Sequence, residues 1–453
     1  MRASPEDMAA GARGEDTVAG AGGDGPRVGV EGADTRVVLL MGSLTYRARP
    51  FVEAAARLGL EVVRGLDMPR PISAHRDVEL PLDFRSPDRA VRDLVAYARR
   101  HPVRAILSVD DAATVIASRA CAMLGLAHNA PDAAAAARDK YVMRRRLADA
   151  GVPSPCFTRY HTDADPLEIA PDVAYPVVVK PLLLSGSQGV IRANNPAEFV
   201  AAFNRTRAIV LGTGGEPGED HKGHVLVEDY LPGVEVEVEG ILANGQLQVL
   251  AIFDKPDPLV GPFFEETIYV TPSRLPHATQ EASVACASEA CAALGLREGP
   301  IHAELRVDDA GPWVVEVAGR SIGGLCAKIL RFGTEDVSLE ELILRRAVGL
   351  DVASLRREDR AGGVMMIPIP RAGILKRVDG LEAARAVGGV EEIDITLPLN
   401  HPVVPLPEGS SYLGFIFARG ERPAEVEESL REAHRCLRFT IVPRIGLSVA
   451  AVP

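Results

Sequence analysis

The sequence predicts a protein of several domains that combines α/β and α+β architecture. Strands alternate with helices in the first part of the chain, which is the pattern of parallel βαβ units. Farther along, predicted strands follow one another across hairpin turns, as in an antiparallel sheet. The length of 453 residues also exceeds the usual size of one domain. We therefore expect an α/β region followed by a large and a small α+β region.

The chain is expected to become ordered near residue 35. Residues 1–34 are rich in Gly, Ala, Asp and Glu without apolar periodicity, which predicts a disordered tail. Residues 35–135 are predicted to form the α/β domain. Its strands are expected at 37–42, 60–67 and 105–111, with helices at about 49–58 and up to residue 126. Asp110 and Asp111 end the third strand, at the edge where such sheets bind ligands, so a substrate role and a domain-interface role are both open.

Residues 136–358 are predicted to form the large α+β region, and residues 359–453 the small one. Asn244-Gly245 is a strong hairpin signal between two strands of the large region. Apolar and polar residues alternate in GVEVEVEGIL (233–242), which predicts an antiparallel strand with one solvent-exposed face. The small region mixes strands with one charged helix at 423–437.

The composition excludes several classes of protein. The net charge of −12, from 62 acidic and 50 basic residues, argues against bulk binding of nucleic acid or of an anionic membrane. No apolar run approaches the roughly 18 residues needed to cross a bilayer. The N-terminus lacks the apolar core of a secretory signal, and the six cysteines are scattered without a CxxC pair. We therefore expect reduced thiols and a cytoplasmic location.

Lysine is scarce, because only six of the 50 basic residues are lysines. Lys180 ends an apolar strand, where a buried charge requires an anionic partner. The loop that follows contains Ser185, Gly186, Ser187 and Gly189, whose backbone N–H groups and hydroxyls suit an anion such as phosphate. A flexible hairpin loop explains the glycines equally well.

A second hairpin is predicted in IHAELRVDDAGPWVVEVAGR (301–320). Glu304 and Glu316 lie at equal distances from its turn, so they should face each other with Cβ atoms about 4.5–5.5 Å apart. Two facing carboxylates repel and need a cation or a shared proton, and oxygen ligands suit Mg²⁺. His302 shares this face as a metal ligand or, more plausibly, as a hydrogen-bonded structural residue. Arg320 would grip phosphoryl or carboxylate oxygens, or form a salt bridge to one of the glutamates.

These motifs, in this order, resemble those of an ATP-grasp carboxylate–amine ligase. The matching segments are RDKYVMRRRLADAGVPSP (138–155), VVVKPLLLSGSQGV (177–190), VEDYLPGVEVEVE (227–239) and HAEL with VVEVAGR. The similarity spans about residues 35–450 and is nearest to the L-amino-acid ligase branch, which forms dipeptide-like amides. It implies an ATP-grasp fold with a Rossmann-like N-terminal (pre-ATP-grasp) domain, a small lid subdomain at about 157–229, and a small C-terminal α+β lid domain.

The resemblance also implies roles for particular residues. It places Lys140 and Lys180 on the ATP phosphates, Ser187 and Gly189 in the phosphate loop, Glu228, Tyr230 and Leu231 around adenine, Glu235 on ribose, Glu304 and Glu316 on the metal, and Arg320 beside the acyl phosphate. Lys180 and Arg320 are the implied catalytic residues. Ala318 stands where many members have a metal-binding Asn, so one or two Mg²⁺ ions are expected, with Mn²⁺ as a possible substitute.

Substrate recognition is expected from the segment at 253–272. Glu266, or alternatively Glu265, would bind a substrate amino group, although a surface acidic pair explains both residues equally well. Lys255 would lie near phosphate or pair with Asp254 or Asp257. Two further residues, Gly323 and Gly324, would leave room for a sizeable substrate side chain.

The expected function is ATP-dependent joining of a carboxylate, such as an amino acid or peptide-like acid, to an amine through an acyl phosphate. The expected partners are these small molecules and a possible second copy of the chain, with no nucleic acid and no membrane. The alternatives are an ATP-grasp carboxylase or purine-pathway-type ligase, and a nucleotide-binding module without turnover. The Lys-poor, Ala/Arg-rich composition suggests a role in specialised metabolism.

Overall fold

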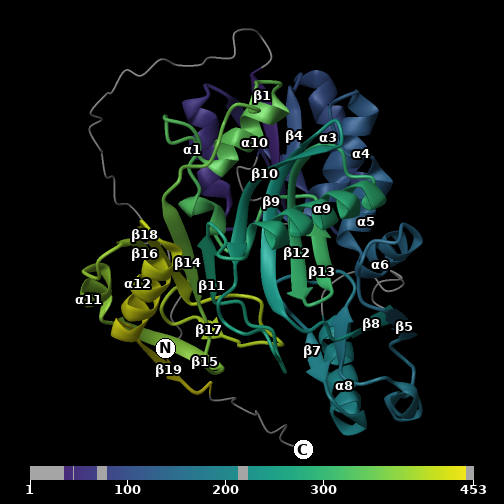
Figure 1. Cartoon of the computed structure of the whole chain (residues 1–453). Helices are drawn as coiled ribbons and strands as arrows, with labels where there is room; N and C mark the ends of the chain where they lie inside the picture. Colours follow the sequence, from purple (N-terminus) through teal and green to yellow (C-terminus); the bar gives the residue numbers. More distant parts are fainter. Residues whose placement is uncertain (1–34, 44, 69–78, 213–222, 445–453) are drawn as a thin grey trace, which may run out of the picture.

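The computed structural model describes residues 35–43, 45–68, 79–212 and 223–444 (Figure 1). The tail predicted for residues 1–34 lies outside these described residues. Within them, no helix combines the length and the apolar character that a membrane span requires. Four β-sheets, with helices packed on them, make up the described part of the chain.

The first sheet is parallel, as the alternation of strands and helices predicts. Its strand order is β3-β2-β1-β4. The strands are β1 (Arg36–Gly42), β2 (Glu61–Asp67), β3 (Leu80–Leu82) and β4 (Ala105–Ser108), and the helices are α1 (Ala48–Arg57), α3 (Pro87–Arg100) and α4 (Thr114–Leu124). The apolar run of β1 is buried on both faces, because helices cover both sides of such a sheet.

A small antiparallel sheet of order β5-β8-β6-β7 forms a separate layer at the bottom of the view in Figure 1. It consists of β5 (Phe157–His161), β6 (Val177–Pro181), β7 (Ile191–Ala193) and β8 (His224–Asp229). The helix α8 (Pro196–Gly212) packs on it through Phe199 and Phe203. The short helix α7 (Pro166–Ile169) packs on α8, whereas α5 (Pro131–Arg138) and α6 (Lys140–Asp149) contribute to the apolar core under the large sheet.

The large sheet has eight strands in the order β13-β12-β9-β10-β11-β14-β18-β16. Its strands are β9 (Val234–Ala243), β10 (Gln246–Asp254), β11 (Ile268–Thr271), β12 (Gly299–Asp308), β13 (Gly311–Ala318), β14 (Ala361–Ile367), β16 (Val390–Asp394) and β18 (Gly414–Gly420). The pairing of β11 with β14 carries the sheet across residue 358, the boundary predicted between the two α+β regions. The predicted turn at Asn244-Gly245 joins β9 to β10.

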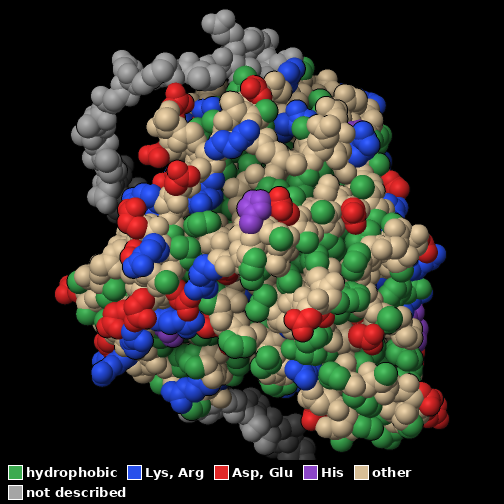
Figure 2. All heavy atoms as spheres, viewed as in Figure 1, with side chains coloured by type: hydrophobic (Ala, Val, Ile, Leu, Met, Phe, Trp, Pro, Cys, Tyr) green, Lys and Arg blue, Asp and Glu red, His purple; other side chains and the backbone are tan. Residues whose placement is uncertain are grey.

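The C-terminal region adds a third antiparallel sheet of order β17-β15-β19. The remaining elements are α9 (His277–Leu294), α10 (Leu339–Ala347), α11 (Leu381–Arg385), α12 (Pro423–Cys436), β15 (Gly373–Asp379), β17 (Pro402–Val403) and β19 (Arg438–Val442). Figure 2 shows acidic and basic side chains intermingled in the area where Figure 1 places α12. On this helix Arg431 pairs with Glu427, and Arg435 pairs with Glu432, so charges of both signs alternate there.

The prediction that one face of the strand at 233–242 is exposed to solvent is wrong. Apart from its ends, β9 is buried on both faces. One face packs against α9 in an apolar core, and the other carries Glu235, Glu237 and Glu239. An alternating pattern distinguishes two faces but does not distinguish bulk water from the polar wall of a cavity.

Candidate active site

A cavity of about 380 Å³ lies between the small and large sheets and receives residues from every region of the described chain. The predicted site residues that line it are Lys140, Lys180, Ser187, Glu228, Tyr230, Leu231, Glu235, Glu266, Glu304, Glu316, Arg320, Gly323 and Gly324. Gly189 does not line the cavity. Its N–H points to the C-terminal region, where it donates to the Pro407 carbonyl at 2.8 Å. Its neighbours Gly186 and Ser187 face the cavity, and both have positive φ.

The predicted pairing of the two glutamates is confirmed. Glu304 on β12 lies opposite Glu316 on β13, and a bulge shifts the register just beyond this pair. Each side chain is 23% exposed, so both carboxylates are partly desolvated at the cavity wall. The two carboxylates differ in their neighbours, because Glu316 contacts Lys140 whereas Glu304 lies near His302.

Lys140 is the first residue of α6. Asp139 caps this helix, because its carboxylate accepts hydrogen bonds from the N–H groups of Tyr141 and Val142. This cap directs the Lys140 ammonium to the cavity, where Nζ lies 3.0 Å from Glu316 Oε2. The same Nζ donates to the Leu184 carbonyl at 2.9 Å. A lysine held at a helix start beside a carboxylate and a Ser/Gly loop suits the binding of a phosphate and its metal.

Lys180 is buried on β6, and its Nζ lies 2.5 Å from Glu228 Oε2. Burial lowers the pKa of Lys180, an effect that the charge of Glu228 opposes. Arg144 completes this buried group by donating to Glu228 at 2.8 Å. Burial favours the neutral form of Glu228, but the two cations outweigh it and lower the pKa of this carboxyl. The Glu228 carboxylate therefore pairs with Lys180 and Arg144, while its backbone lies in β8 between β5 and β6.

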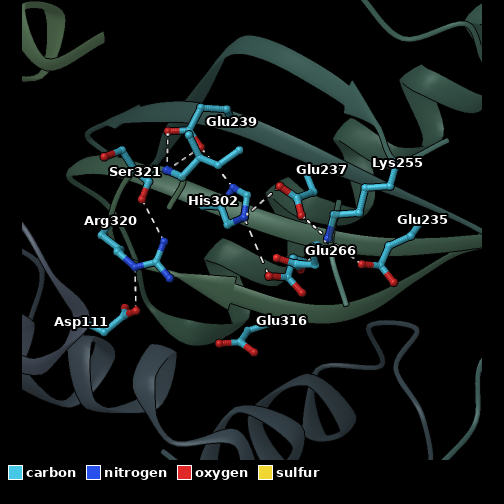
Figure 3. A network of polar contacts seen from close by, with 12 residues as sticks. Asp111, Glu235, Glu237, Glu239, Lys255, Glu266, His302, Glu316, Arg320 and Ser321 are labelled. Carbon is cyan, nitrogen blue, oxygen red and sulfur yellow. Dashed lines mark hydrogen bonds and ion pairs between the residues drawn. The ribbon is translucent and has the colours of Figure 1, made fainter. Parts of the chain in front are cut away.

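The ammonium of Lys255 is the centre of a second buried group (Figure 3). It lies 2.7 Å from Glu235 and 2.8 Å from Glu266, and it also pairs with Glu237. Burial lowers the pKa of Lys255, but the surrounding carboxylates outweigh this and raise it well above its usual value. Glu235 is further bound by Arg306 at 2.9 Å. The predicted ribose and amino-group ligands, Glu235 and Glu266, thus share one internal cation.

The expected pairing of Lys255 with a neighbour in sequence is wrong. The Asp254 carboxylate instead accepts hydrogen bonds from Ser273 and Arg274, because successive strand residues point to opposite faces. Asp257 pairs with Arg431 on α12. Lys255 instead pairs with the glutamates of β9 and with Glu266.

His302 is hydrogen-bonded to buried glutamates, and it also belongs to one group of side chains that could hold a metal. Its Nε2 lies 3.1 Å from Glu237 and its Nδ1 lies 3.2 Å from Glu239. Burial lowers the pKa of His302, but the two carboxylates reverse this and raise it to about 10. Glu239 also accepts a hydrogen bond from the N–H of Ile322 and so anchors the chain just after Arg320. Figure 3 shows this connection from His302 through Glu239 to that segment.

Arg320 does not form the alternative salt bridge to Glu304 or Glu316. Its Nε lies 2.6 Å from Oδ2 of Asp111, in the loop after β4 (Figure 3). Burial lowers the pKa of Arg320, but Asp111 and the glutamates raise it above its usual value. Arg47 of the N-terminal region binds the carbonyl and hydroxyl of the adjacent Ser321. The N-terminal region therefore orients Arg320 in the cavity.

The residues around Glu304 suit a divalent cation. Among the described residues, two sets of three groups could hold a metal, Glu237 with His302 and Glu304, and Glu235 with Glu266 and Glu304. Burial, together with the nearby charges of Glu266 and Glu316, outweighs the opposing charge of Lys255 and raises the pKa of Glu304 to about 8. Since the raised pKa means that the charged form of this carboxyl is disfavoured, a bound cation would stabilise the carboxylate. Glu316 belongs to neither set, and its carboxylate contacts Lys140.

Sequence reasoning missed Arg144, Glu237, Glu239 and Arg306. The signal for the glutamates was their spacing of two residues on one strand, which places them on one face with Glu235. Arg306 follows Glu304 by the same spacing on β12. Their importance comes from partners on other strands, which the spacing does not reveal.

Comparison with known families identifies the domains. A model of the ATP-grasp N-terminal domain matches residues 52–128, and a model of the ATP-grasp domain matches residues 173–329. The fold and these matches identify ATP-grasp domains in the chain. The model of the L-amino acid ligase C-terminal domain 2 matches residues 365–442, so the chain carries the ATP-grasp domains together with that ligase domain.

The individual relatives agree with this assignment. The "Uncharacterized protein y4rH" of Sinorhizobium fredii is 23% identical over 90% of this chain and 84% of its own length. The alanine–anticapsin ligase of Bacillus subtilis is 28% identical over 55% of this chain, which spans about half (54%) of that relative. The crystal structure of an L-amino acid ligase from Bacillus licheniformis has a TM-score of 0.73 and 25% identity, covering 90% of this chain and 98% of its own.

Proposed function

We propose that the protein is an ATP-dependent carboxylate–amine ligase that activates an amino acid or peptide-like acid and joins it to an amine. The observation that carries the proposal is one cavity in which Lys140, Lys180, Arg320 and the pair Glu304/Glu316 converge. Cations around a metal site are what phosphoryl transfer to a carboxylate requires. The domain matches and the similarity to amino-acid ligases support the same activity.

The proposed reaction has two steps. The substrate carboxylate attacks the γ-phosphorus of ATP, which gives an acyl phosphate and ADP, and the amine then attacks the acyl carbon and displaces phosphate. Lys140 and Lys180 hold the phosphate oxygens, while Arg320 stabilises charge at the acyl phosphate. Mg²⁺ on Glu304 and Glu316, as one or two ions with Mn²⁺ as a substitute, would neutralise the charge of the transferred phosphoryl group.

The proposed binding site for the acid's side chain lies at Gly323 and Gly324. A Cβ atom at Gly323 would meet no atom within 4 Å, so this position is open. At Gly324 a Cβ atom would lie 2.3 Å from Sδ of Met366, so Met366 already occupies that space. The proposal therefore places the size limit of the substrate at Met366.

The test is phosphate release with ATP, Mg²⁺ and a panel of amino-acid pairs, with products identified by mass spectrometry. The proposal expects an amide product whose amount depends on both acid and amine. Tight ATP binding without amine-dependent phosphate would favour the nucleotide-binding module. Bicarbonate-dependent phosphate release would favour the carboxylase alternative.

Two further properties are proposed on narrower grounds. A cytoplasmic location agrees with the six cysteines, all of which are free thiols. A homodimer is proposed for solution, and light scattering on the full chain tests it by mass.

A first prediction concerns the metal carboxylate. Glu316→Ala should abolish amide formation while the fold persists, because the partly exposed carboxylate serves the ligand and not the core. Activity assays and circular dichroism measure the two properties. Asp309→Ala, at the exposed turn of the same hairpin, is the matched control and should remain active. A fully active Glu316→Ala enzyme would refute the metal role.

A further inference from the structure

The loop of residues 185–190, called the phosphate loop below, follows β6 and forms hydrogen bonds with the C-terminal region. The Gly189 N–H donates to the Pro407 carbonyl at 2.8 Å, and the Gln188 side-chain amide donates to the Glu408 carbonyl at 2.7 Å. Gly186 lies against Ser410, since a Cβ atom on this glycine would be 3.5 Å from the Ser410 carbonyl oxygen. Residues 405–410 therefore contact three positions of the loop. We call residues 405–410 the latch segment.

The helix behind the phosphate loop is bonded to the same segment. Arg205 on α8 forms a two-pronged ion pair with Glu408, with N–O distances of 2.6 and 2.9 Å. The next residue, Thr206, donates its hydroxyl to the Gly189 carbonyl at 2.8 Å. Gly189 is thus held on one side by α8 and on the other by the latch segment, which explains its position outside the cavity.

The conformation of the latch segment is itself restricted. Gly409 donates its N–H to the Pro405 carbonyl at 2.9 Å, which closes a tight turn around Glu408. A Cβ atom at Gly409 would lie 1.9 Å from the Val404 carbonyl oxygen, so the turn accepts no side chain there. Ser410 and Tyr412, which follow the turn, line the cavity. One short turn therefore connects the outer ion pair to the cavity wall.

We propose that Arg205 and Glu408 are positioning residues that hold the phosphate loop closed over the cavity, so that the C-terminal region completes the lid. The inference rests on the proposed function, because an acyl phosphate must be kept from water until the amine arrives. The pair is 44% exposed on each side, so water can compete with it and the loop can open for exchange of ligands. Loss of the pair shifts the loop toward the open form and lets water intercept the acyl phosphate.

The experiment uses the full-length protein with a substrate pair that the wild type joins. It compares Arg205→Glu, Glu408→Arg and the double reversal, measuring phosphate released per amide formed and amide hydrogen exchange of residues 185–190. Each single reversal should raise the phosphate-to-amide ratio by about two- to fivefold, the range of one exposed ion pair, and should speed exchange in the loop. The double reversal should restore both values.

Arg36→Ala is the matched control, because Arg36 forms an equally two-pronged pair with Glu61, at 2.9 and 2.8 Å, away from the cavity. It should leave the ratio and the loop exchange unchanged. Single reversals that behave like the wild type, or a double reversal without recovery, would overturn the proposal. If the wild type forms no amide with any pair, the proposed function fails, while hydrogen exchange still tests the latch.

Discussion

Three carboxylates converge on the ammonium of Lys255, beside the cavity. Glu235, Glu237 and Glu266 would otherwise face one another with little water to screen them. Glu237 is fully buried, and burial favours its neutral form, yet Lys255 and His302 lower the pKa of this carboxyl to about 2. The charge state of Glu237 thus depends on one lysine and one histidine.

Lys255→Met should therefore destabilise the protein strongly. Removing one partner of a buried ion pair costs about 3–5 kcal/mol, because the remaining charge has no counterion. Urea unfolding of the full chain measures the change. The double variant Lys255→Met/Glu237→Gln should recover part of the loss, since it also removes the most buried of the three charges. Equal stability of Lys255→Met and the wild type would contradict the assignment.

The raised pKa of Glu304, about 8, predicts a pH dependence of metal binding. Below this pKa the carboxyl is protonated, and a metal must displace the proton. The apparent affinity for Mg²⁺ should therefore rise as pH increases from about 6 to 8 and level off above. Calorimetry of Mg²⁺ binding with ATP, in buffers of different ionisation enthalpy, should detect proton release near neutral pH and none well above it. An affinity independent of pH would contradict this prediction.

At the scale of single elements, the hairpin of β12 and β13 could be predicted in detail. Its partners are close in sequence, and the turn between them sets which residues face each other. The strand β9 was predicted as a strand, but its glutamate face was assigned to solvent. The pairings of Lys255 with β9 and of Arg144 with β8 join elements distant in sequence, so local patterns carry no information about them.

The start of α6 is an element whose geometry reaches the site directly. Asp139→Ala removes the acceptor for two N–H groups and should cost about 1 kcal/mol in the free energy of unfolding. It should also raise the KM for ATP, because the cap fixes the first turn of α6, which carries the proposed ATP ligand Lys140. Denaturant unfolding and steady-state kinetics measure the two effects. Asp139→Asn keeps an acceptor and should preserve both values, whereas an unchanged KM in Asp139→Ala would contradict the role of the cap.

At the scale of the whole molecule, the cavity depends on contacts between regions. The ion pair of Arg320 with Asp111 joins the β13 end to the N-terminal sheet, and the pair of Arg205 with Glu408 joins α8 to the C-terminal region. The large sheet connects these regions through the pairing of β11 with β14. The site is therefore assembled by the arrangement of regions and not by one of them.

Asp111→Asn should lower kcat by between about ten- and a hundredfold, because a misplaced Arg320 no longer meets the reacting group. The KM for ATP should change little, since Asp111 pairs with Arg320 and not with Lys140 or Lys180. Steady-state assays separate the two constants. Asp88→Asn, on the surface of the same region, should behave like the wild type. A rise in the KM for ATP alone would place Asp111 at the nucleotide instead.

Local sequence was sufficient for the fold class, the ATP-grasp resemblance, most strands and helices, and the facing pair Glu304/Glu316. These features follow from periodicity, turn residues and motifs whose order is readable along the chain. The partners of Lys255, Arg320 and Glu228, and the contact of the phosphate loop with Pro407 and Glu408, required the three-dimensional arrangement. The reason is physical: a buried charge is stabilised by whichever opposite charge packing brings within a few ångströms, and packing joins residues without regard to their separation in sequence.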